Sequence, residues 1–244
     1  MDPDITLCSQ LCDLSYENSI DDAVITSFKS IGLDIKDAQI TTDKGSVSFS
    51  YDDAGRLFIA WRGTKTFLNL VQDMDILRRF LVIDGTRYGK VHSGLLDYYD
   101  SIKDKVAAQI TDHLSSSNKD KDIVFSGYSL GACICFAALE CAIKHPNVNM
   151  KVITFASPMM GNKSFVKSFD NKVKDNIRVV LDADAIPKFR YDDFLHVKGE
   201  FIIRSGVRFS WLLVFLGLFE LAFKISNTRN LVKYHYLSTY LTFM

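Results

Sequence analysis

The chain has 244 residues, with 29 basic and 29 acidic side chains and a formal net charge of zero. Hydrophobic residues make up 48% and charged residues 24%, which are ordinary proportions for a globular protein and exclude disordered, collagen-like and coiled-coil classes. A dedicated nucleic-acid-binding protein is also disfavoured, because there is no excess of Lys and Arg to neutralise phosphates. The length and the lack of repeats or low-complexity linkers predict a single domain over residues 1–244.

The charges are unevenly distributed along the chain. Residues 1–60 carry eleven acidic and four basic side chains, whereas residues 197–244 carry six basic and two acidic ones. The sequence does not open with a basic start and an apolar run, so we expect no secretory signal. The five cysteines have neither disulfide-framework nor zinc-ligand spacing. We therefore expect an intracellular, cytoplasmic protein with buried, reduced thiols.

The apolar pattern changes from helical to strand-like and then alternates between the two. Apolar residues three or four apart predict helices over residues 4–16 and 20–31. Strands are expected at 46–51 and 57–61, and a strand or hairpin at 76–90. Helices and short apolar strands then alternate, at 99–116, 122–125, 130–144, 151–155, 162–172 and 177–181. This order predicts an α/β fold with a mostly parallel sheet covered on both faces, and with antiparallel strands at its opening edge.

The sharpest local signal is Gly127-Tyr128-Ser129-Leu130-Gly131, which fits the G-x-S-x-G pattern. It lies between a predicted strand and a predicted helix, where a tight turn would expose the Ser129 hydroxyl. The glycines leave room for close backbone approach, and the free N–H groups at the helix start face a developing oxyanion. The motif predicts a serine nucleophile at Ser129.

A serine hydroxyl needs a base that is oriented by a carboxylate. In this kind of turn the chain order is serine, then acid, then histidine. The candidate acids after the last predicted strand are Asp182 and Asp184, and the histidines that follow them are His196 and His235. Chain order alone does not decide between Asp182 and Asp184, or between His196 and His235.

Several segments in the same order resemble the class 3 (fungal-type) lipases, which have the α/β-hydrolase fold. The resemblance runs from about residue 5 to about residue 240. It rests on Trp61-Arg62-Gly63-Thr64, Val91-His92-Ser93-Gly94, the nucleophile segment Ile123 to Gly131, Thr154-Phe155-Ala156-Ser157-Pro158 with Gly161-Asn162, and the segment Arg178 to Pro187.

The resemblance implies a role for each candidate. Asp184 becomes the catalytic acid and His235 the catalytic base, whereas Asp182 becomes a loop-organising or solvated carboxylate. It places His92 and His196 in structural segments, and we expect His113 and His145 on the surface without a role. The implied oxyanion hole combines the backbone N–H of Leu130 with that of Thr64, whose hydroxyl also contributes. The chemistry needs no metal and no cofactor.

Three positions depart from the family pattern. Tyr128 replaces the usual histidine before the nucleophile, Ala132 replaces a glycine in the first helical turn, and Ala156 replaces another glycine. None of these changes removes a catalytic group. The bulk of Tyr128 predicts a different acyl pocket or different neighbours.

Two apolar segments flank the predicted site. Residues 65–73 are either an amphipathic lid or a plain core helix. The run 209–225 is too short to span a bilayer comfortably, because a transmembrane helix needs about 20 apolar residues. It is a core helix that shields the site, a peripheral contact with a membrane or lipid droplet, or, least favoured, a true span.

Together these features predict a serine esterase or lipase that hydrolyses carboxylic esters of acylglycerols or phospholipids through Ser129, Asp184 and His235. One alternative is a catalytically silent lipase-like binding or scaffold protein, which the complete set of three residues disfavours. Another is a serine hydrolase acting on non-lipid esters, which the apolar flanking segments disfavour.

Overall fold

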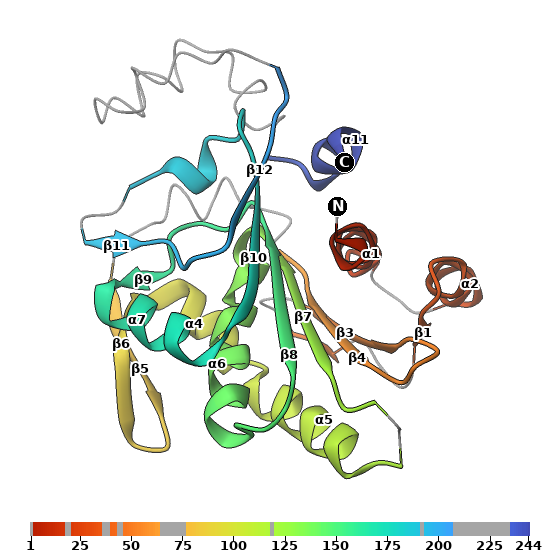
Figure 1. The fold of residues 1–244 in the computed structure, drawn as a ribbon, viewed down its shortest axis with the longest axis horizontal. Coiled ribbons are helices and arrows are strands. Elements are labelled where there is room, and N and C mark those ends of the chain that lie inside the picture. The colour runs from red at the N-terminus through yellow and green to blue at the C-terminus, as the bar shows by residue number, and fades with distance from the viewer. Residues whose placement is uncertain are drawn as a thin grey trace.

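The computed structural model of the chain describes residues 2–17, 21–35, 40–42, 46–63, 77–117, 120–190, 193–206 and 235–244. Its centre is an eight-stranded sheet (Figure 1). The strand order is β1 (Asp34–Ile35), β3 (Ser46–Tyr51), β4 (Leu57–Trp61), β7 (Ile123–Tyr128), β8 (Met150–Phe155), β10 (Asp175–Leu181) and β12 (Glu200–Ile203), with β2 (Ile40–Thr41) also paired to β3.

The five strands from β4 to β12 run parallel, and β1, β2 and β3 join them as antiparallel strands. This arrangement confirms the predicted mostly parallel sheet and its antiparallel opening edge. Because parallel strands end at the same edge, the loops that follow β7 and β10 meet there. Ser129 and Asp184 lie in those two loops.

Helices cover both faces of the sheet (Figure 1). On β4, Phe58 and Ala60 face one cluster of apolar side chains, and Leu57, Ile59 and Trp61 face the other. The first cluster lies beneath α1 (Pro3–Leu14), α2 (Asp22–Ser30) and α11 (Leu237–Phe243). The second lies beneath α4 (Ser93–Asp100), α5 (Lys103–Ser115), α6 (Ile134–Lys144) and α7 (Lys163–Lys172). Burial on both faces explains why the strands are continuous apolar runs.

The predicted helix 99–116 is wrong in one respect, because the structure contains two helices there. Helix α4 ends at Asp100 and α5 begins at Lys103. Between them Ile102 leaves the helical conformation, with φ −136°, and buries its side chain in the core. The periodicity continues across the break, so the sequence pattern could not reveal it. Similarly, the predicted helix 130–144 begins as a 3-10 turn, η1 (Ser129–Cys133), before α6.

A second, four-stranded sheet lies beside the first. Its order is β11 (Phe194–Leu195), β9 (Gly161–Asn162), β6 (Thr86–His92) and β5 (Arg78–Ile83). Strands β5 and β6 form the hairpin expected at 76–90, with Asp84 and Gly85 both at positive φ in the turn. That pair matches the turn type that suits a two-residue hairpin.

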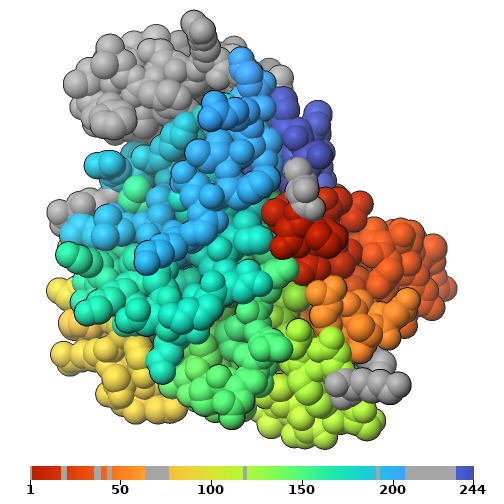
Figure 2. Space-filling model, in the orientation of Figure 1, coloured from red at the N-terminus to blue at the C-terminus, as the bar shows by residue number. Residues whose placement is uncertain are grey.

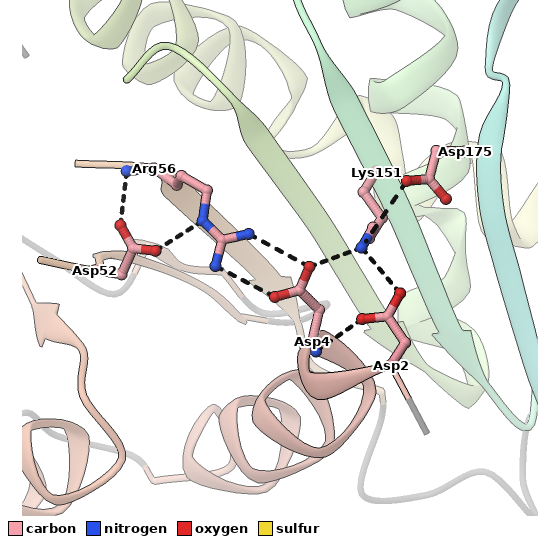
Figure 3. A network of polar contacts seen from close by, with 6 residues as sticks. All are labelled: Asp2, Asp4, Asp52, Arg56, Lys151 and Asp175. Atoms are coloured by element: carbon pink, nitrogen blue, oxygen red, sulfur yellow. Dashed lines mark hydrogen bonds and ion pairs between the residues drawn. The ribbon is translucent and has the colours of Figure 1, made fainter. Parts of the chain in front are cut away.

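The amino end of α1 is fixed to the strands by a charged network (Figure 3). The Asp4 carboxylate accepts hydrogen bonds from Lys151 Nζ at 2.8 Å and from both terminal nitrogens of Arg56 at 3.3 Å. Asp2 caps α1 through the Asp4 N–H and also pairs with Lys151 at 3.0 Å. Burial raises the pKa of Asp4, but the hydrogen bonds from Lys151 and Arg56 outweigh it and hold that pKa below its usual value. The network anchors α1 at the end of the sheet opposite Ser129.

Helices α1 and α11 lie side by side on the same face of the sheet, as Figure 2 shows in red and dark blue. Among the described residues, no helix is both long and apolar enough to cross a membrane.

Candidate active site

Ser129 occupies a sharp turn between β7 and η1. Its φ is +56°, a left-handed value that is unfavourable for a residue with a side chain, and its side chain is buried. The turn closes only because of its glycines. A Cβ on Gly131 would lie 2.0 Å from the carbonyl oxygen of Trp61, and one on Gly127 would lie 2.1 Å from that of Gly131. The motif therefore forms the strained strand-to-helix turn that the sequence predicted, with backbone packed against β4.

The Ser129 hydroxyl contacts a histidine that lies 106 residues further along the chain. Ser129 Oγ lies 2.8 Å from His235 Nε2, and His235 Nδ1 lies 2.9 Å and 3.1 Å from the two carboxylate oxygens of Asp184. A carboxylate can only accept, so Nδ1 carries the proton and Nε2 offers its lone pair to the hydroxyl. The structure thus brings together the three residues predicted from the sequence.

Asp184 is held by two further donors and is fully buried. The Ile186 N–H donates to its Oδ1 at 2.9 Å, and the Tyr240 hydroxyl donates to its Oδ2 at 2.7 Å. Tyr240 also accepts the Leu181 N–H at 3.0 Å. Burial, followed by the negative charge of Asp184, raises the pKa of Tyr240 well above its usual value, so the phenol stays protonated and donates. The carboxylate is therefore fixed from both sides.

The other acid candidate points elsewhere. Asp182 Oδ1 accepts hydrogen bonds from the backbone N–H of Ser205 at 2.8 Å and from its hydroxyl at 2.5 Å. Burial raises the pKa of Asp182, but the two Ser205 hydrogen bonds and the charges of Lys188 and Arg204 together lower it more, so that it lies below its usual value. Asp182 links the end of β10 to the segment after β12.

The structure also describes the other four histidines. His92 Nδ1 accepts the Gly94 N–H at 3.1 Å and caps α4, and His196 Nε2 lies 2.5 Å from the Pro187 carbonyl oxygen. His145 is half-buried at the end of α6. The expected surface position of His113 is wrong: its side chain is buried, with its ring 5.7 Å from that of Tyr51. The helical pattern places His113 beside the buried Ile110, so it faces the core.

The structure describes only one of the two predicted oxyanion donors. Leu130 is buried in the first turn of η1, directly after Ser129. N–H groups in a first helical turn have no acceptor within the helix, so they are available to an anion. Thr64, the segment 65–73 and the run 209–225 lie outside the described residues.

Two residues at this site were not assigned roles from the sequence. Tyr240 supports Asp184, and Tyr128 packs against His235 with ring centroids 5.4 Å apart. Tyr240 stands five residues after His235, and this spacing matches no sequence pattern that would predict its contact with Asp184. Tyr128 was noticed only as a departure from the family pattern.

The described residues contain no group of three or more His, Cys, Asp or Glu side chains that could hold a metal ion. All five cysteines are buried thiols. Burial raises the pKa of Cys12 to about 12 and that of Cys141 to about 12, so neither is an activated nucleophile.

A family model described as "Lipase (class 3)" matches residues 58–194, which is more than half of the chain. The chain belongs to the class 3 lipase family. The matched range contains Ser129 and Asp184 but ends before His235, which the structure places in contact with both.

The curated proteins that this chain matches are distant relatives. It is 26% identical to "Lipase" of Rhizopus niveus over 192 residues, covering 76% of this chain and 46% of that protein. It is also 26% identical to "Phospholipase A1-II 6" of Oryza sativa subsp. japonica over 180 residues, covering 62% of this chain and 43% of that protein. The chain thus spans about half the length of the curated relatives it matches.

Solved structures of fungal lipases share the fold. The Rhizomucor miehei triacylglyceride lipase superposes with a TM-score of 0.72 at 20% identity, covering 82% of this chain and 79% of that one. The lipase of Rhizopus microsporus var. chinensis superposes with a TM-score of 0.70 at 21% identity, covering 82% and 73%. These similarities confirm the predicted α/β-hydrolase fold.

Proposed function

We propose that this class 3 lipase-family chain is a serine esterase that hydrolyses carboxylic esters of acylglycerols or phospholipids. The observation that carries the proposal is the continuous hydrogen-bonded path from Ser129 Oγ through His235 to the buried carboxylate of Asp184. A protein without turnover has no need of this alignment, so the path disfavours the silent scaffold.

In the first half of the reaction, Ser129 Oγ attacks the ester carbonyl carbon while His235 Nε2 removes its proton. Asp184 stabilises the imidazolium that forms. The carbonyl oxygen becomes an oxyanion, which the Leu130 N–H binds, together with Thr64 as the second proposed donor. When the intermediate collapses, the ester C–O bond breaks and the leaving alcohol takes the proton from Nε2.

The second half repeats these steps with water as the nucleophile. His235 Nε2 removes a proton from water, the resulting hydroxide attacks the acyl-Ser129 carbonyl, and the C–Oγ bond breaks. Ser129 Oγ regains its proton from His235 and the fatty acid leaves. These steps involve no metal or cofactor.

Two observations support the proposed substrate class. The relatives' names pair this family with lipases and with phospholipases A1. The chain itself has apolar runs at 65–73, before Ser129, and at 209–225, between Asp184 and His235. An intracellular location stays a prediction.

The test is labelling with a fluorophosphonate probe, followed by hydrolysis assays on acylglycerols, phospholipids and p-nitrophenyl esters of increasing chain length. We expect wild type to be labelled and Ser129→Ala to remain unlabelled, with turnover reduced about a million-fold. Absence of labelling in folded wild type contradicts the esterase. Labelling with hydrolysis of short soluble esters only contradicts the lipid substrate.

We further propose that residues 209–225 dock on lipid, supported by the basic balance of the chain around them. Flotation with liposomes containing anionic lipid tests this. The double variant Trp211→Asp with Phe215→Asp should remain at the bottom of the gradient, whereas Phe80→Asp on the exposed face of β5 should float like wild type. Equal flotation of all three proteins contradicts the docking.

A further inference from the structure

The aromatic ring before the nucleophile lies against the proposed catalytic base. Tyr128 is the last residue of β7, and its ring is tilted by 31° from the His235 imidazole, with the centroids 5.4 Å apart. Both side chains are buried. One flat face of the imidazole is therefore occupied by Tyr128, while its two nitrogens contact Ser129 and Asp184.

The phenol oxygen of Tyr128 makes a second contact with the segment that carries His235. It faces the backbone of Leu237, the first residue of α11, an interaction that lowers the pKa of the phenol. The Leu237 N–H has no acceptor within its own helix. The ring of Tyr128 thus packs against His235, and its hydroxyl lies near the start of the helix two residues later.

Tyr128 also contacts a second aromatic ring. The ring of Tyr16, just after α1, meets it edge-on at 6.3 Å and 63°, and the Arg62 guanidinium lies 5.8 Å from the centre of the Tyr16 ring. Burial, followed by the charge of Asp184, raises the pKa of Tyr128 well above its usual value, so it stays a neutral phenol. Four side chains therefore contact one another in sequence: Arg62, Tyr16, Tyr128 and His235.

We infer that Tyr128 is a positioning residue, whose ring keeps the His235 imidazole in line between Ser129 and Asp184. For catalysis the inference rests on the proposed function. The ring restricts rotation of the imidazole out of the plane of its two hydrogen bonds. Its electron-rich face also favours the imidazolium that forms when Ser129 loses its proton. The chain thus uses a tyrosine where its family pattern has histidine.

The experiment compares Tyr128→Leu, which removes the ring, with Tyr128→Phe, which keeps it. The matched control is Phe125→Leu, which removes a buried ring from the same strand but on the opposite face of the sheet. We expect Tyr128→Leu to lower kcat for a short soluble ester about 10- to 100-fold with KM within about twofold, because misplacement of a catalytic group costs turnover rather than binding. Tyr128→Phe should recover most of kcat, and Phe125→Leu should keep it.

A second readout does not depend on activity. The proton on His235 Nδ1, bonded to Asp184, should give a far-downfield ¹H NMR resonance that is absent from His235→Ala. We expect it to persist in Tyr128→Phe and Phe125→Leu and to broaden or vanish in Tyr128→Leu. An unchanged resonance in folded Tyr128→Leu overturns the inference, as does an equal loss of kcat in Phe125→Leu or Tyr128→Phe. If wild type proves inactive, the proposed function fails and the resonance alone decides the role of Tyr128.

Discussion

The Tyr240 hydroxyl donates to the Asp184 carboxylate at 2.7 Å while it accepts the Leu181 N–H at 3.0 Å. Tyr240→Phe removes the donor and leaves a buried N–H unpaired, which typically costs about 1–3 kcal/mol. We expect a lower free energy of unfolding in urea and a kcat reduced roughly tenfold, since Asp184 loses one of its two extra supports. Tyr236→Phe, an exposed tyrosine four residues earlier, is the control and should change neither quantity. Wild-type values in Tyr240→Phe would refute the supporting role.

The turn around Ser129 depends on the missing side chain of Gly131. In Gly131→Ala the new Cβ would collide with the Trp61 carbonyl oxygen, which is backbone of a central strand and has no room to move. We expect the free energy of unfolding to fall by about 3 kcal/mol or more, measured by urea denaturation. At Gly94 a Cβ would meet only the His92 ring, at 3.2 Å, so Gly94→Ala should cost less than about 1 kcal/mol. Equal losses in both variants would show that the close approach at Gly131 is unimportant.

The network around Asp4 should make stability depend on acid pH. The folded-state pKa of Asp4 lies below its ordinary value of 3.8, so its contribution is complete above about pH 4 and is lost as the pH falls through the lower, folded value. Asp4→Asn should therefore destabilise by roughly 2 kcal/mol at pH 7, and much less below the folded pKa. Urea denaturation at both pH values measures this, with the exposed Asp53→Asn as control. A pH-independent difference would mean that the Asp4 charge contributes nothing.

His196 should also make the folded protein less stable as the pH falls, but over a higher pH range than Asp4. Burial, followed by the charge of Arg178, lowers the pKa of His196 from 6.5 to about 4. Between these values the unfolded chain binds a proton that the folded chain does not, so stability falls as the pH drops from 6.5 to 4, by up to about 3 kcal/mol. His196→Gln should remove that dependence, while fluorophosphonate labelling of Ser129 at neutral pH persists. Loss of labelling in a folded variant would instead place His196 in the catalytic machinery.

Much of the fold was predictable from local pattern. The strands at 46–51 and 57–61 match β3 and β4 residue for residue, because Val47, Phe49 and Tyr51 alternate with serines in the first and the second is a continuous apolar run. The two-residue strands β1, β2, β9 and β11 were not predicted. They are defined by the strands with which they pair rather than by their own residues, and the partner of β11 lies about 30 residues away along the chain.

The choice between Asp182 and Asp184 could not be made from spacing. Both follow β10, and the direction of each carboxylate is decided by its donor: Ser205 for Asp182, and His235 with Tyr240 for Asp184. The family resemblance selected Asp184, and the geometry agrees with that choice. The support from Tyr128 and Tyr240 depends on contacts across the fold, which no local pattern encodes.

Helix α11 has only seven residues, of which Leu237 and Tyr240 are buried. A helix this short is marginal without tertiary contacts, so its docking beside α1 depends on a few side chains. Such a segment can detach locally while the parallel strands remain intact. Because His235 lies only two residues before α11, the reactivity of Ser129 depends on whether α11 is docked. At low denaturant concentration, the reactivity of Ser129 should be lost before the secondary structure of the protein.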